Sequence, residues 1–220
     1  MNFVRHHWYD IGFGISLILL GFLIGIYDRS SELRTIALLN LIVLLWRQFE
    51  AYRFPGGYPA CFNYLAPGHI ESNVDRYPLN SHNSFFINIV LIIAYALPVI
   101  FSKGVSLAFM PIAFGILYPL MTVYFMARRH YHGYVPGLFC SLFGHLPLGL
   151  YWLYVVMYHQ WVGITDVLRG GLYLILFCVI FMLNFGFGLF ISSKSVYPFT
   201  EDEMERGGFA KRLRQWRHIK

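Results

Sequence analysis

Long, nearly uninterrupted stretches of apolar residues alternate with short polar segments along this chain. A helix that crosses the hydrocarbon core of a bilayer needs about 20 predominantly apolar residues. Six stretches approach or exceed that length: Trp8–Tyr27, Leu33–Phe49, Ser84–Phe101, Val105–Ala127, Val135–Gln160 and Leu168–Ile191. The pattern therefore predicts an all-α fold, a polytopic membrane helix bundle of about six transmembrane helices.

The second stretch, residues 33–49, is the weakest of the six. Its uncharged core, Thr35–Trp46, has only 12 residues, so it must borrow length from polar flanks or lie partly in the membrane interface. Prolines interrupt the fourth and fifth stretches. Helices in lipid tolerate proline where neighbouring groups satisfy the freed carbonyls, so we retain both stretches as spans.

Composition supports a membrane location. Hydrophobic residues make up 57% of the chain and charged residues 13%, whereas an ordinary soluble domain is roughly one quarter charged. We expect a transmembrane domain over residues 1–195 and a basic tail over 196–220. The three cysteines, Cys61, Cys140 and Cys178, show no metal-binding spacing, so we expect no metal site and no cofactor.

Lysine and arginine predict the orientation of the bundle. With six crossings, both termini and the second and fourth connections lie on one side, and that side carries thirteen of the 17 basic residues. The positive-inside rule places this side, with both termini, in the cytoplasm. The net charge of +6 then reflects topology and an anionic inner leaflet, with membrane lipids and not nucleic acid as partners.

The longest connection, residues 50–83, is rich in proline, glycine, asparagine and aromatic residues. We call it the cap loop. Loops of this length are usually functional or disordered, and its aromatic content argues against disorder. We expect an ordered cytoplasmic loop packed on the ends of the spans.

The tail contains a second amphipathic pattern. Thr200 resembles a helix N-cap with acidic residues in the first turn, and two glycines end that segment. Beyond them, Phe209, Leu213 and Trp216 share one helical face, and basic residues occupy the others. This pattern is typical of an interfacial helix on an anionic membrane; the alternative is a frayed basic tail that only enforces topology.

Ionisable groups at membrane depth are candidate functional residues, because their desolvation is costly. Arg47, Glu50 and Arg53 follow at intervals of three on one helical face and can form two salt bridges. They could bind a polar headgroup or peptide end at the mouth of the bundle, or they could merely end the helix and neutralise one another.

His145 lies midway along the fifth stretch, two residues before Pro147. It could act chemically, or it could simply hydrogen-bond within a proline-kinked helix. The intramembrane asparagines Asn40 and Asn88 are poor partners for a metal site. A basic, histidine-containing cluster, residues 128–132, ends the fourth stretch and could contact lipid phosphate or serve as an ordinary span flank.

Several short segments, in matching order, resemble the HXXEE-motif membrane proteins, a bacterial family without an established activity. They are Gln48–Gly57, Tyr77–Asn80, Asn88, Tyr134–Leu138 and Gly144–Gly149. The motif histidine falls on Arg47, its first glutamate on Glu50 and its second on Ala51, so only one of the three defining residues is retained. The resemblance implies the bacterial cytoplasmic (inner) membrane and, with two potential metal ligands replaced, a structural or binding role.

Three functions are compatible with these residues. The leading hypothesis is a non-enzymatic membrane protein whose cap loop binds a lipid, a small amphiphile or a partner protein. The second is a membrane enzyme acting on a lipid-like substrate, with Glu50 as general base and His145 as its partner. The third is a small transport or substrate-capture subunit. The expected binding residues are Arg47, Glu50, Tyr52, Arg53, Asn88 and His145.

Overall fold

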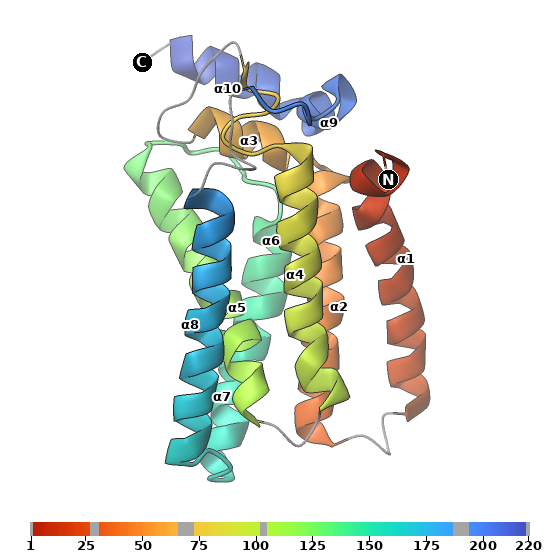
Figure 1. Ribbon diagram of the computed structural model, residues 1–220, viewed down its shortest axis with the longest axis vertical. Coiled ribbons are helices and arrows are strands. Elements are labelled where there is room, and N and C mark those ends of the chain that lie inside the picture. Colours follow the sequence, from red (N-terminus) through yellow and green to blue (C-terminus); the bar gives the residue numbers. More distant parts are fainter. Residues whose placement is uncertain (1, 27–30, 66–72, 102–104, 187–193, 219–220) are drawn as a thin grey trace.

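The computed structural model describes residues 2–26, 31–65, 73–101, 105–186 and 194–218, and all regular secondary structure in these ranges is helical. The long helices run side by side along the longest axis of the molecule (Figure 1). They are α1 (Asn2–Ile26), α2 (Glu32–Tyr52), α4 (Ser81–Ile100), α5 (Val105–Arg128) and α8 (Ile164–Gly186), together with one composite rod. The predicted all-α bundle is thus confirmed.

The composite rod consists of α6 (Leu138–Cys140), a π-helical turn (Ser141–His145) and α7 (Leu146–Tyr158). We call it the α6–α7 rod. The wider π turn lies just before Pro147, whose nitrogen carries no hydrogen to continue the α-helical ladder. Each predicted apolar stretch overlaps one helix or the α6–α7 rod, with the largest difference at the start of the first, which begins at Asn2 and not at Trp8. The expected ends of the first and last stretches, Tyr27 and Ile191, lie outside the described residues.

Four helices are long and apolar enough to cross a membrane: Phe3–Gly25, Ser81–Ile100, Val105–Arg128 and Leu138–Tyr158. The second predicted span is not among them, yet α2 has 21 residues and is about 31 Å long. It lies at the centre of the bundle, in contact with α1, α4 and the α6–α7 rod. Its modest hydropathy therefore goes with a position covered by other helices and not with insufficient length.

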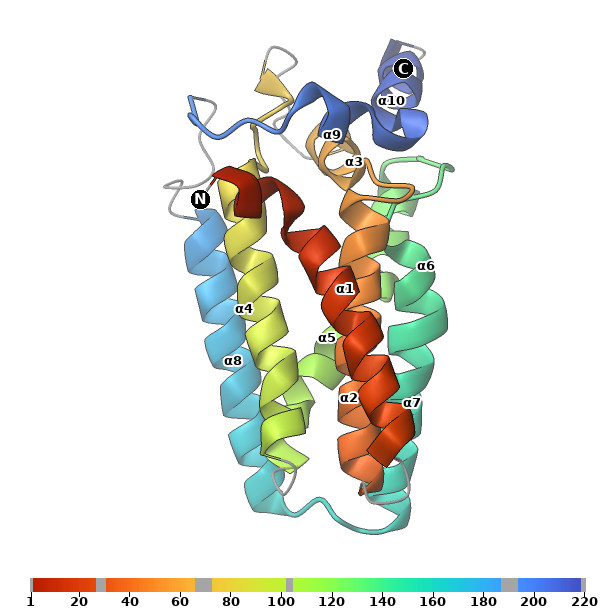
Figure 2. The same cartoon turned by 90° about the vertical axis from the view of Figure 1, so that its right-hand side faces the viewer.

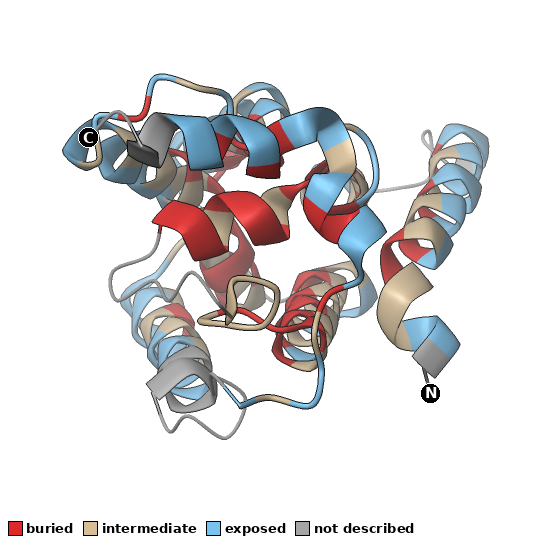
Figure 3. Cartoon of the chain, turned by 90° about the horizontal axis from the view of Figure 1, so that it is seen from above, coloured by how far each residue is buried: buried red, intermediate tan, exposed pale blue. Residues whose placement is uncertain are grey.

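Short helices cover one end of the bundle. They are α3 (Tyr58–Leu65), α9 (Glu201–Glu205) and α10 (Phe209–His218), and they lie across the ends of the long helices (Figures 1 and 2). We call these three helices, with segment 73–79, the cap layer. A buried apolar cluster joins α3 and α10 to Trp8 of α1 and Tyr52 of α2. Seen from above, buried residues fill the middle of this layer (Figure 3).

The cap loop is ordered over its described part, as its aromatic content predicted. The buried side chain of Asn63 in α3 donates hydrogen bonds to the carbonyls of Val74 and Leu79 and accepts one from the Leu79 amide. These bonds tie segment 73–79 to α3. The turn before α3 needs glycine, because a side-chain carbon at Gly57 would lie 2.5 Å from the carbonyl oxygen of Arg206.

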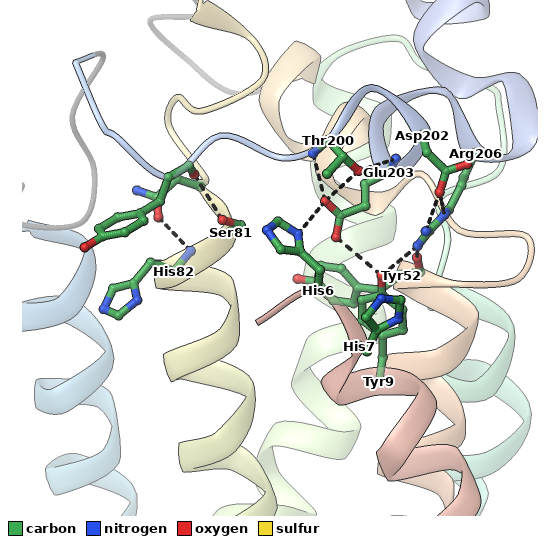
Figure 4. A network of polar contacts seen from close by, with 12 residues as sticks. His6, His7, Tyr9, Tyr52, Ser81, His82, Thr200, Asp202, Glu203 and Arg206 are labelled. Atoms are coloured by element: carbon green, nitrogen blue, oxygen red, sulfur yellow. Dashed lines mark hydrogen bonds and ion pairs between the residues drawn. The ribbon is translucent and has the colours of Figure 1, made fainter. Parts of the chain in front are cut away.

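The C-terminal segment is joined to the start of the chain by a polar network (Figure 4). Thr200 and Glu203 form the predicted N-terminal cap of α9, a reciprocal capping box. The buried Glu203 carboxylate also contacts His6 at 2.9 Å. Arg206 donates to the Tyr9 hydroxyl at 2.8 Å and to the Tyr52 carbonyl at 2.6 Å. The tail is therefore packed onto α1 and α2 and does not stand apart from residues 1–195.

The expected destination of the tail's apolar face is wrong. The amphipathic helix exists as α10, but Phe209 and Leu213 are buried in the apolar cluster with α3. Leu213 is 0% exposed, so this face is used inside the protein and neither enters a membrane surface nor frays. The side chain of Trp216 lies outside what the structure describes.

The two ends of the bundle differ in the segments that they carry. Helix α1 begins and α10 lies at the cap-layer end, where α2 and α5 also end, whereas the connection between α7 and α8 lies at the opposite end (Figures 1 and 2). Both termini therefore share one end with the second and fourth connections.

Leu213→Ala should weaken the docking of α10 by about 2–5 kcal/mol, because it removes buried methyl groups and leaves a cavity. In detergent-solubilised protein, trypsin should then cleave after the exposed Lys211 and Arg212 at least tenfold faster. Gln215→Ala, on the exposed face of the same helix, is the matched control. An unchanged cleavage rate in Leu213→Ala would show that α10 is not held by this face.

Candidate binding cavity

Glu50, in the last turn of α2, caps the start of the α6–α7 rod. Its carboxylate accepts hydrogen bonds from the backbone amides of Gly137 (3.0 Å), Phe139 (3.0 Å) and Cys140 (2.8 Å), and from the Tyr134 hydroxyl. The first amides of a helix have no partner within the helix, and the helix dipole favours an anion there. A carboxylate from one helix thus satisfies the buried start of another.

The turn before the rod is shaped to meet α2. Gly137 has a φ of 91°, a left-handed conformation that glycine adopts without steric cost. A side-chain carbon at this position would lie 3.3 Å from the Ala51 methyl group. The small residues at 51 and 137 therefore allow the two backbones to approach closely enough for Glu50 to reach the amides.

The predicted salt bridges of Arg47 and Arg53 with Glu50 are wrong. The Glu50 carboxylate faces the α6–α7 rod, while Arg53 pairs with Asp10 of α1 at 3.3 Å and is half exposed. The Arg47 guanidinium instead lies over the Tyr118 ring of α5, with 3.9 Å between its central carbon and the ring centroid. The i, i+3 spacing favours local pairs, but a buried helix start offers the carboxylate more donors than one guanidinium does.

Arg47 is a buried cation without a carboxylate partner in the described part of the chain. Only 6% of the residue is exposed, and its Nε atom has no hydrogen-bond partner. The faces of Tyr118 and Phe114 supply cation–π attraction. That attraction does not replace the hydrogen bonds that a guanidinium makes in water, so a buried charge in this state is costly.

The guanidinium lines a cavity of about 80 Å³ directly beneath the cap layer. Residues of α2, α3, α4 and α5 surround it. Its polar lining consists of Arg47, Tyr52, Tyr58, Ser84, Asn88 and Tyr118, and the rest of its wall is apolar.

Hydrogen bonds order one wall of this cavity. The Ser84 hydroxyl donates to the Tyr52 hydroxyl at 2.7 Å. The Asn88 amide donates to the Ser84 carbonyl at 2.8 Å and, at 3.4 Å, to the Tyr52 hydroxyl. This wall joins the end of α2 to the first two turns of α4, so its polar atoms are held in fixed positions.

Arg47 is the basic residue of the cavity lining, and none of the lining residues is acidic. Burial raises the pKa of Tyr58, in α3, well above its ordinary value. A tyrosine whose pKa is raised stays protonated at neutral pH and cannot serve as the counter-ion of Arg47.

His145 lies elsewhere. It ends the π turn, and its Nδ1 atom is 2.5 Å from the Asn40 Oδ1 atom, so the Nδ1 hydrogen is donated to the asparagine. The Nε2 atom is buried without a partner, and Tyr95 packs edge-on against the ring. In the described chain no hydrogen bond joins His145 to Glu50, so the expected catalytic pair is not formed. No metal-binding group of three acidic, histidine or cysteine residues occurs in those ranges either.

Of the six expected binding residues, Arg47, Tyr52 and Asn88 meet at the cavity, while Glu50, Arg53 and His145 do not line it. Sequence reasoning missed Tyr58, Ser84 and Tyr118. Tyr58 stands in the glycine- and proline-rich part of the cap loop, which was a usable signal. Tyr118 gave none, because aromatic residues make up 19% of the chain.

No protein family, characterised protein or solved structure matches this chain. The cavity must therefore be interpreted from its own chemistry.

Glu50→Gln should lower the free energy of unfolding by about 1–3 kcal/mol, because the amide has one acceptor oxygen and loses the anion at the helix start. The melting temperature of the detergent-solubilised protein measures this. Glu205→Gln is the control, since that carboxylate is half exposed and pairs only with Arg214 at 2.6 Å. If both variants melt like the parent protein, the cap formed by Glu50 contributes nothing to stability.

Proposed function

We propose that this protein is a six-span protein of the bacterial inner membrane, with both termini cytoplasmic. It binds a lipid or small amphiphile beneath its cap layer and does not alter it chemically. The observation that carries this proposal is the cavity under the cap layer, with the buried Arg47 guanidinium in its wall. Four helices meet the requirements for a span, and the proposal adds α2 and α8.

The position of the cavity suits an amphiphile. Arg47 lies five residues before the end of α2, or about 8 Å below it. Along α4, the lining passes from Ser84 near the cap layer to Leu91 deeper in the bundle. A ligand with a polar end and an apolar body matches this change from polar to apolar walls.

A binding role is favoured over catalysis and over docking of a partner protein. The Glu50 carboxylate is occupied by four donors, so it is not placed to act as a general base. The cap-loop residues Tyr52 and Tyr64 are buried in the apolar cluster that includes Phe209 and Leu213 of α10, although Phe54 is exposed. The cap layer therefore closes over a site inside the bundle.

We also infer that the chain is a divergent relative of the HXXEE-motif proteins. Two of the segments that carry the resemblance meet at Glu50, which accepts hydrogen bonds from residues within 134–140, and Gln48 joins the first of them to Asn88. Gly144 belongs to the same assembly, since a side-chain carbon there would lie 2.5 Å from Val43. The proximity supports a shared structural role for these segments.

The orientation can be tested by labelling with a membrane-impermeant maleimide. In intact cells, Gly163→Cys, between α7 and α8, should be labelled, and Lys211→Cys, on the exposed face of α10, should be labelled only after the membrane is permeabilised. The reverse pattern would place the cap layer outside the cell. Labelling of both positions in intact cells would overturn the six-span topology.

Binding can be tested by filling the cavity. Radiolabelled dodecanoic acid and dodecanol, added to protein in lipid nanodiscs, should show saturable binding of at least one of the two above that of nanodiscs without protein. Ile87→Phe replaces an aliphatic side chain of the cavity lining on α4 with a larger aromatic one and should weaken that binding at least tenfold. Ile93→Phe, at a 56% exposed position of the same helix, should leave it unchanged. Absence of saturable binding of either compound would refute the proposed function.

A further inference from the structure

The strongest chemical constraint in the cavity is the charge of Arg47. Arginine remains protonated at all physiological pH values, and here its side chain is almost fully buried with Nε lacking a partner. Buried charges in proteins are normally paired, because desolvation without a counter-charge is expensive. The cavity beside the guanidinium is where a counter-charge has room to bind.

The described chain does not supply that counter-charge. Glu50, the nearest acidic residue in the sequence, gives its carboxylate to the start of the α6–α7 rod. Asp10 pairs with His7 and Arg53, and Glu203 with His6. The tyrosines around the cavity include Tyr58, whose hydroxyl stays protonated at neutral pH. Among the described residues, no carboxylate complements Arg47, and the cavity beside it has room for an anionic ligand.

Charge and volume limit which anion fits. One guanidinium neutralises one negative charge, so a phosphate monoester, with close to two charges at neutral pH, would leave excess charge buried. A cavity of about 80 Å³ holds a handful of water-sized groups. A phosphodiester would have to place two substituents around this space, whereas a carboxylate carries one.

The geometry around the guanidinium also favours a planar anion. The Arg47 guanidinium lies over the Tyr118 ring at 3.9 Å, and the Nε atom on its edge has no hydrogen-bond partner, so that edge can accept an anion. Arginine and carboxylate groups pair through two parallel hydrogen bonds in one plane. The ordered hydroxyl of Tyr52 accepts bonds from Ser84 and Asn88, so its own hydrogen can be donated to an anion in the cavity.

From these observations we propose that the cavity is a carboxylate site, and that its ligand is a monocarboxylic acid whose carboxylate pairs with the edge of the Arg47 guanidinium. This inference rests on the proposed function and specifies the chemical class of the ligand. Two sources share this chemistry: a fatty acid from the surrounding membrane and a short-chain acid from the cytoplasm.

The test compares compounds that differ only in their polar end. Dodecanoate, dodecanol and dodecyl phosphate are measured on the same protein in nanodiscs. Dodecanoate should bind at least tenfold more tightly than either of the others. If hexanoate displaces labelled dodecanoate at a concentration similar to that of unlabelled dodecanoate, the carboxylate site is supported and its ligand comes from the cytoplasm. If only unlabelled dodecanoate displaces it, the carboxylate site is supported and its ligand comes from the membrane.

Variants separate the charge from the fold. Arg47→Gln should reduce dodecanoate binding at least tenfold and leave dodecanol binding unchanged, so the alcohol reports that the cavity is intact. Arg47→Lys keeps the positive charge but loses the planar group that can form two parallel hydrogen bonds with a carboxylate. This variant should prefer dodecanoate over dodecanol to an intermediate degree. Arg53→Gln, on the same helix but half exposed and paired with Asp10, is the matched control and should bind like the parent protein.

The outcomes distinguish the two proposals. Equal binding of dodecanoate and dodecanol, or tighter binding of dodecyl phosphate, would overturn the carboxylate site while leaving an amphiphile site in place. Full acid preference in Arg47→Gln would also overturn it. No binding of any of the three compounds would refute the proposed function itself.

Discussion

The carboxylate of Glu50 at the start of the α6–α7 rod is the contact on which this structure depends. A helix that starts inside a protein leaves amides that water cannot reach, and each such amide costs free energy unless an acceptor is provided. Glu50 provides that acceptor for three of them. Because its charge is used there, Arg47, one turn earlier, is left without a carboxylate partner among the described residues. One contact thus both fixes the rod against α2 and defines the charge of the cavity.

Helix α2 holds the bundle together through polar side chains spaced along its length. Asn40 contacts His145 of the α6–α7 rod, Gln48 donates to the Asn88 carbonyl of α4, and Glu50 caps the rod. In lipid, apolar side chains gain little by leaving their surroundings for another helix, so association relies on close packing and hydrogen bonds between helices. A central helix with polar contacts to α4 and to the α6–α7 rod meets this requirement, and the same residues lower the hydropathy of its sequence.

Local patterns predicted what is local in this fold. The lengths of the apolar stretches located the helices, and the sequence around Thr200 predicted the start of α9. The partners of Glu50 lie 84 or more residues away, and spacing within α2 favoured nearby arginines instead. The pattern of α10 showed that Phe209 and Leu213 form an apolar face, but amphipathicity alone does not tell whether lipid or α3 covers it. Arg47, Tyr52 and Asn88 were predicted as binding residues. Nothing in the sequence around Tyr118 distinguished it from the many other aromatic residues of the chain.

Arg206 contacts both the turn at Gly57 and the Tyr9 hydroxyl of α1. These contacts have a consequence for the order in which the parts of the protein fold. Residues 199–213 leave the ribosome after every helix of the bundle has been made, yet they complete contacts to α1 and to the end of α2. Until these residues dock, the aromatic side chains of α3 are uncovered and the cap layer above the cavity is incomplete. Closing of the cap layer is therefore a late folding step, in which α9 and α10 dock on helices that are made before them.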